Sequence, residues 1–139
     1  MCLESINNPK GVVHKRLCKL KYGYKVFIQE GQINCNLYPL YCGRNVQLPI
    51  GEWINRKEVN RVNNTIQVKH NDRVVGEYKA GFHVFVDVQD AKDYAMASNE
   101  VVRKVMFKNV VASGLNSLEM NRCCTVVAGY IKILEEGVK

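Results

Sequence analysis

Proline is scarce in this chain, with 3 residues among 139, and glycine is ordinary at 10. This composition excludes a long flexible linker. Hydrophobic residues make up 47% and charged residues 24%, close to the average of globular proteins, which excludes disordered, collagen-like and low-complexity chains. A chain of this length has room for one hydrophobic core, so we expect a single domain over residues 1–139.

Long apolar runs are also missing. No stretch approaches the roughly 20 apolar residues that a membrane-spanning helix needs. The first residues, MCLESINNPKG, lack the apolar segment of a signal peptide. We therefore expect a soluble, cytoplasmic protein with no membrane partner.

The six cysteines do not form a metal-binding pattern. No CxxC or HxxxH pair occurs among Cys2, Cys18, Cys35, Cys42, Cys123 and Cys124. Cys123 and Cys124 are adjacent, so on a strand their side chains would point to opposite faces and could not easily share one ion. We predict free thiols in a reducing compartment, with no metal site and no cofactor.

The standard motifs of catalysis and nucleotide binding are absent: there is no P-loop, GxGxxG, GxSxG, HExxH or EF-hand pattern. If the protein is an enzyme, the candidate catalytic residues are His83, Arg103 and Cys2. His83 titrates near neutral pH, Arg103 could clamp a phosphate or carboxylate, and Cys2 would carry both a thiol and an amine after removal of Met1. Each also has a structural interpretation. His83 could be a hydrogen-bonded histidine of the fold, and Arg103 could lie on the solvent face. No supporting motif accompanies Cys2.

Acidic residues are missing between Glu4 and Glu30, a segment that contains six lysines and arginines. The whole chain has a formal net charge of +7. An excess of this size favours association with polyanions through counterion release. The alternative is a solvated positive surface without a ligand.

Alternating hydrophobicity predicts strands at 23–29, 33–37, 65–69, 73–78, 82–86, 101–108 and 123–134. The strand at 101–108 is expected to continue to 112 after a bulge, with a loop at 115–122. One main helix is predicted at about 88–98, with Asp87 as its N-cap and Val88, Ala91 and Ala95 as its buried stripe. The fold class is therefore α+β: a mixed, mostly antiparallel sheet of five to seven strands with the helix packed on one face.

Three segments break this periodicity. Residues 1–10 are expected to form an N-terminal arm, 38–64 a long loop with short extended or helical pieces, and 135–139 a loose tail. The loop interleaves aromatic rings with cations, a combination that suits base stacking, phosphate contact or a protein hot spot. Its candidate binding residues are Tyr38, Tyr41, Arg44, Trp53, Arg56, Lys57 and Arg61, to which we add Phe82, His83 and Arg103.

Several short motifs together carry a family resemblance. The MC start, GYKVF, GEW, GFHVF, DAKDYA, VVRKVMF and VVAGYIKIL resemble small uncharacterised proteins of bacteriophages and prophages. The resemblance implies a viral or prophage origin and no particular activity. A more distant similarity, through the strand that begins at Gly81 and the helix after it, is to ADP-ribosyltransferase-like folds, but their Arg–Ser–Glu or His–Tyr–Glu set is not found.

These observations support three functional hypotheses. The first is a non-enzymatic phage accessory protein, such as an anti-defence protein, that binds a host protein, a nucleoprotein or a defence-related nucleotide. The second is a small enzyme acting on a nucleotide or acyl substrate, either ADP-ribosyltransferase-like or an N-terminal cysteine hydrolase. The third is a nucleic-acid-binding module that uses the basic surface.

Overall fold

The computed structural model describes residues 5–6, 20–30, 36–39, 47–59, 65–70, 72–118 and 121–137. Its strands are β1 (Ser5–Ile6), β2 (Tyr22–Glu30), β3 (Asn36–Pro39), β4 (Trp53–Asn55), β5 (Thr65–His70), β6 (Arg73–Lys79), β7 (Phe82–Phe85), β8 (Glu100–Leu118) and β9 (Asn121–Gly137). Its helices are α2 (Arg56–Val59) and α3 (Val88–Tyr94). The predicted fold class is confirmed: the named strand pairs are antiparallel and one main helix packs on the sheet.

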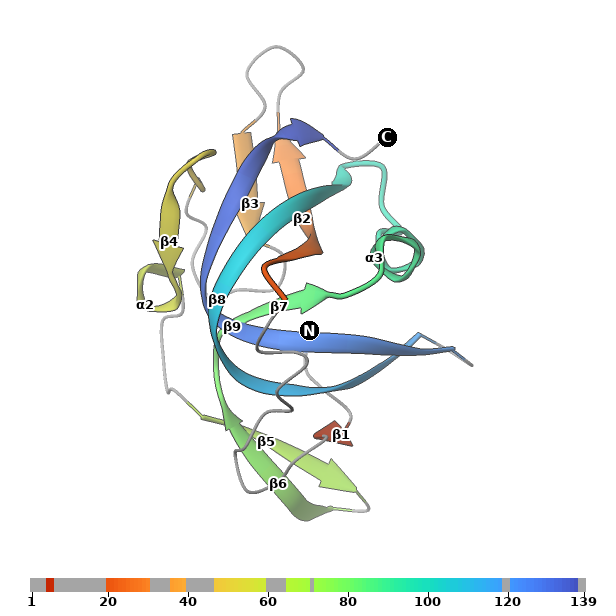
Figure 1. The fold of residues 1–139 in the computed structure, drawn as a ribbon. Coiled ribbons are helices and arrows are strands. Elements are labelled where there is room, and N and C mark those ends of the chain that lie inside the picture. Colours follow the sequence, from red (N-terminus) through yellow and green to blue (C-terminus); the bar gives the residue numbers. More distant parts are fainter. Residues whose placement is uncertain are drawn as a thin grey trace.

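The larger sheet has seven strands and closes on itself. β2 pairs with β8 on one side and with β7 on the other, β7 pairs with β9, and β9 returns to β8. Figure 1 shows β8 and β9 curving strongly as they complete this ring. We call this ring the closed sheet.

The main core lies inside the closed sheet. Its fully buried side chains come from all four strands of the ring and include Phe27, Val84, Val105 and Ile133. The sequence predicted that the core would lie between one flat face and the helix. Closure of the sheet instead encloses most of the apolar surface within the strands themselves.

The two longest strands bend together near their middles. Asn109 has a left-handed backbone (φ 56°) and lies beside Gly129, and the β8–β9 register shifts between Val110 and Ala112. The predicted bulge after residue 108 is therefore confirmed. The predicted loop at 115–122 is wrong, because β8 continues to Leu118 and pairs with β9 up to Asn121.

This bend also changes which β9 residues face the core. Val126 and Ala128 belong to the main core, and so do Ile131 and Ile133, three and five residues after Ala128. Unbroken alternation along the strand predicted at 123–134 would put Val127 on the same face as Ile131 and Ile133. Val127 instead packs on the outer surface, because the alternation shifts by one residue at the bend.

α3 covers one part of the outer surface of the closed sheet. Ala91, fully buried, packs against Val26 and Phe85. The Asp87 side chain accepts a hydrogen bond from the Gln89 N–H at 2.7 Å, so the predicted N-cap is confirmed. The helix ends at Tyr94 rather than near 98, because the Met96 N–H donates to the Glu100 carboxylate at 2.8 Å instead of continuing the helical pattern.

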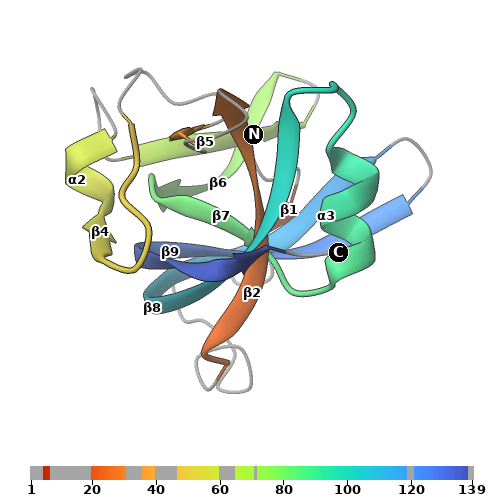
Figure 2. The ribbon, with the colours of Figure 1, turned by 90° about the horizontal axis from the view of Figure 1, so that it is seen from above.

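A second part of the outer surface is covered by β6. β5 and β6 form the predicted hairpin, which projects from the closed sheet at the bottom of Figure 1. Tyr78 of β6, only 5% exposed, packs on Ala112 and Val127. Figures 1 and 2 place α3 and β4 on opposite sides of the closed sheet.

The structure describes parts of the three aperiodic segments. Within the predicted arm, Ser5–Ile6 pairs with β8, and the rest of 1–10 lies outside the described residues. Residues 135–137, expected to be loose, belong to β9. Within 38–64, the described residues include β4 and α2, which agrees with the predicted short extended and helical pieces.

Candidate nucleic-acid interface

The third part of the outer surface lies over β2, β8, β9 and β4 and carries aromatic rings and lysines. The side chains that form it are half-buried or exposed. We call this surface the ring–lysine face. It consists of Tyr22, Trp53, Asn55, Lys104, Met106, Lys108, Tyr130 and Lys132.

Strand register brings these residues together from distant parts of the chain. Tyr22 is opposite Met106, Met106 is opposite Lys132, and Lys132 is opposite Trp53, so one row crosses β2, β8, β9 and β4. A second row, two residues along, joins Lys108, Tyr130 and Asn55. Their neighbours along each strand, such as Phe107, Ile131 and Ile54, are buried in the core, which directs these rows outward.

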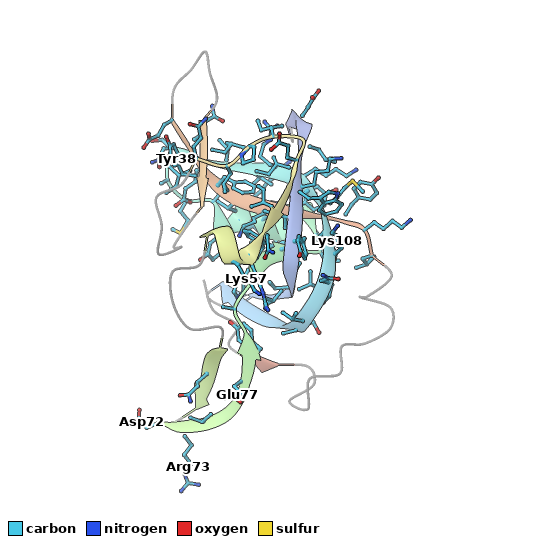
Figure 3. All side chains as sticks on the ribbon, turned by 90° about the vertical axis from the view of Figure 1, so that its left-hand side faces the viewer. Tyr38, Lys57, Asp72, Arg73, Glu77 and Lys108 are labelled. Atoms are coloured by element: carbon cyan, nitrogen blue, oxygen red, sulfur yellow. The ribbon has the colours of Figure 1, made fainter. Side chains whose placement is uncertain are left out.

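Lys108 lies between two rings at the centre of this face. Its Nζ is 4.2 Å from the centroid of the Trp53 ring and 5.0 Å from that of Tyr130. The Asn55 amide donates to the Tyr130 hydroxyl at 3.2 Å and holds that ring in place. Trp53 is 38% exposed, so part of its indole remains open to solvent. Figure 3 looks onto this side of the molecule, with Lys108 beside β8 and β9.

A second ring–lysine pair lies on the β2 side of the same face. The Lys104 Nζ is 4.9 Å from the centroid of the Tyr22 ring, and Tyr22 is 48% exposed. The face thus repeats one arrangement, an exposed ring with an ammonium group over it. Its charge is positive, since it holds three lysines and no aspartate or glutamate among the described residues.

His83 lies elsewhere, on the outer surface beneath β6. Its Nε2 is 3.1 Å from the Tyr78 hydroxyl, and the two rings meet edge to face. Burial, with a smaller contribution from the positive charge of Lys25, lowers the pKa of His83 from 6.5 to about 3. His83 is therefore neutral at physiological pH and enclosed, as expected for the structural alternative considered for it.

Arg103 points into the closed sheet, in the same alternation as Val105. Its Nη2 donates to the main-chain carbonyls of Leu134 and Glu135, at 2.6 and 2.9 Å. These carbonyls lie where the β8–β9 register is irregular. Arg103 therefore donates to carbonyl oxygens that the pairing of β8 with β9 does not use. Arg103 therefore does not take the solvent-facing position considered for it, and its possible role as an anion clamp stays a prediction.

The remaining predicted binding residues that the structure describes do not form one surface. Phe82 is a core residue, and Arg56 donates to the Ala80 carbonyl at 2.9 Å. Tyr38 is half-buried in β3, while Lys57 is exposed on α2, and Figure 3 shows both apart from Lys108. Cys2, Tyr41, Arg44 and Arg61 lie outside the described residues.

Of the predicted residues that the structure describes, Trp53 alone lies on the ring–lysine face. It contacts a lysine of β8 rather than the cations near it in sequence. The sequence did contain a signal for the missed residues, because Lys104, Met106 and Lys108 alternate with Arg103, Val105 and Phe107. Which of the two sets faces outward, and which strands lie beside it, depends on long-range pairing.

No protein family, curated protein or solved structure matches this chain. Within the described part of the chain, no group of three or more histidine, cysteine, aspartate or glutamate side chains is placed to hold a metal ion. Neither α2 nor α3, the helices in the described ranges, has the length and apolar character needed to cross a membrane.

Proposed function

We propose that this protein is a non-enzymatic binding module for nucleic acid, acting through the ring–lysine face. One observation supports the proposal: three lysines and three rings from four paired strands come together on one surface, where each of these side chains is half-buried or exposed. Of the three hypotheses drawn from the sequence, the geometry favours the nucleic-acid-binding module.

The electrostatics of the face suit a polyanion. The net charge of +7 attracts phosphates at long range, and lysines that neutralise phosphates release the counterions condensed on the nucleic acid. Both effects weaken as the salt concentration rises.

The rings add a contribution that salt does not remove. Stacking of a base on an aromatic side chain contributes about 1–3 kcal/mol, whereas an exposed cation–π contact contributes about 0.5–1 kcal/mol. A base can therefore replace the Lys108 ammonium over the Trp53 ring with a net gain, and the displaced ammonium is then available to a phosphate.

Catalysis has less support in the arrangement of the candidate residues. His83 is buried beneath β6, whereas Arg103 points to the inside of the closed sheet and bonds main-chain carbonyls. The two side chains therefore lie on opposite faces of the sheet and do not converge on a substrate.

The setting that we propose follows from the sequence resemblance. A phage accessory protein would act in the cytoplasm of an infected or lysogenic bacterium, where nucleic acid or a nucleoprotein of the host presents the required polyanion. An anti-defence role is compatible with such a partner.

The proposal is tested with a pair of charge-matched variants. K108Q/K132Q removes two lysines of the ring–lysine face, and R73Q/K92Q removes two exposed cations from the hairpin and from α3. Affinity for a fluorescently labelled oligonucleotide is measured by anisotropy across a range of salt concentrations. Because each phosphate contact contributes about 0.7–0.9 to the slope of log affinity against log salt, K108Q/K132Q should reduce the slope by about 1.4–1.8.

The control variant should bind nearly as the wild type does. Equal weakening by both variants would mean that only net charge matters, and the ring–lysine face would then have no special role. Absence of binding at low salt would contradict the proposed function altogether.

A further inference from the structure

We infer that the ring–lysine face is specific for single-stranded nucleic acid, with one base stacked on Trp53 and the adjacent phosphates bound by Lys108 and Lys132. This inference rests on the proposed function and adds the form of nucleic acid that is bound. It follows from the orientation of the rings, the width of the face and the alternation of rings with cations.

The Trp53 ring presents its flat surface to a ligand. The Lys108 Nζ, 4.2 Å from the ring centroid, already lies over that surface, which is where a stacked base would lie. The ammonium group ends a flexible side chain, so it can move aside while the ring stays in place. Tyr22 and Lys104 repeat this arrangement on β2 and β8 and offer a second base a similar position.

The width of the face argues against insertion into a duplex groove. The row from Tyr22 to Trp53 crosses four neighbouring strands. With strands about 4.8 Å apart, the outer two are roughly 14 Å apart before side chains are added. The major groove of B-DNA is about 12 Å wide and admits a helix or a two-stranded ribbon.

A duplex also hides the part of the base that this face can contact. In a duplex, the flat surfaces of the bases are stacked on one another and only their edges are open in the grooves. In a single strand the flat surfaces can unstack and lie on aromatic side chains, while the backbone follows the cations. The row Tyr22, Met106, Lys132, Trp53 has a ring at each end and a cation between them, so it supplies both kinds of contact.

Trp53 is the only tryptophan of the chain, so its fluorescence reports directly on stacking. We would titrate the full-length protein with oligothymidylate, with oligouridylate and with a DNA duplex of the same length. Both single strands should quench the Trp53 emission at saturation and bind more tightly than the duplex. A difference between the two single strands would show which sugar is preferred.

Variants separate stacking from charge. W53A should weaken binding of oligothymidylate by about 5- to 150-fold, as expected from the loss of one stacked base, whereas W53F should retain most of the affinity. Y38A is the control, because Tyr38 is a half-buried ring outside the face, and it should bind as the wild type does. Circular dichroism of each variant establishes that the fold is retained.

The outcomes distinguish this inference from the proposed function. If the duplex binds as tightly as the single strand, Trp53 emission does not change and W53A binds normally, the single-strand inference is wrong while nucleic-acid binding stands. If no oligonucleotide binds at low salt, both proposals are wrong.

Discussion

His83 is held neutral by its surroundings. Its side chain is buried beneath Tyr78, and burial lowers its pKa to about 3. In the unfolded chain the same group titrates near 6.5. Below that pH the unfolded state binds a proton that the folded state excludes, so His83 stabilises the fold fully above pH 6.5 and progressively less as the pH falls toward 3.

This difference predicts an acid sensitivity that one substitution removes. Below pH 6.5, His83 should lower the free energy of unfolding by up to about 1.4 kcal/mol per pH unit. H83Q keeps a polar side chain but does not titrate, so its stability should depend less on pH. Urea unfolding of both proteins at neutral and mildly acidic pH measures the difference. Parallel pH profiles for the two proteins would contradict the assignment of His83 as a buried neutral group.

The role of His83 could not be read from the sequence alone. Its strand and its position between two phenylalanines were predictable, but its Tyr78 partner comes from the way β6 folds over the closed sheet. Arg103 is a similar case, since its acceptors, the carbonyls of Leu134 and Glu135, are open only because the register of β8 and β9 is irregular.

At the scale of elements, α3 begins with a local interaction that sequence can specify. The Asp87 carboxylate satisfies the N–H of Gln89, which has no partner within the helix. D87A should therefore destabilise the protein by about 0.5–2 kcal/mol, and D87S should retain most of the stability because serine also caps helices. Thermal or urea unfolding measures both. D93A, an exposed change in the same helix, should cost only a few tenths of a kcal/mol, and an equal cost for D87A would contradict the capping role.

Elements that depend on residues close together in the sequence were predicted correctly, whereas the boundaries that depend on more distant contacts were not. The β5–β6 hairpin and the start of α3 depend on neighbouring residues and were predicted. The end of α3 depends on the Glu100 carboxylate, and the extension of β8 through Ser113 and Gly114 depends on pairing with β9, so both were missed. Local sequence signals of a loop at 115–122 were overridden by that pairing.

At the scale of the whole molecule, closure of the sheet decides what is left for function. A ring of strands encloses the main core, while α3 and β6 cover two parts of its outer surface. The ring–lysine face lies on β2, β8, β9 and β4, and Figures 1 and 2 place β4 on the opposite side of the closed sheet from α3. The sequence indicated outward cations and rings as the working surface, but it placed them in the loop at 38–64. The strand pairing that joins β2 to β4 through β8 and β9 is not visible in local patterns.

The most direct measurement is a map of the amide signals that shift when oligothymidylate is added to the isotopically labelled protein. The largest shifts are expected at Tyr22, Trp53, Lys108, Tyr130 and Lys132, which come together only through the register of the closed sheet. The β5–β6 hairpin and α3 should change little. Shifts concentrated on the hairpin or on α3, with the ring–lysine face unaffected, would contradict the account.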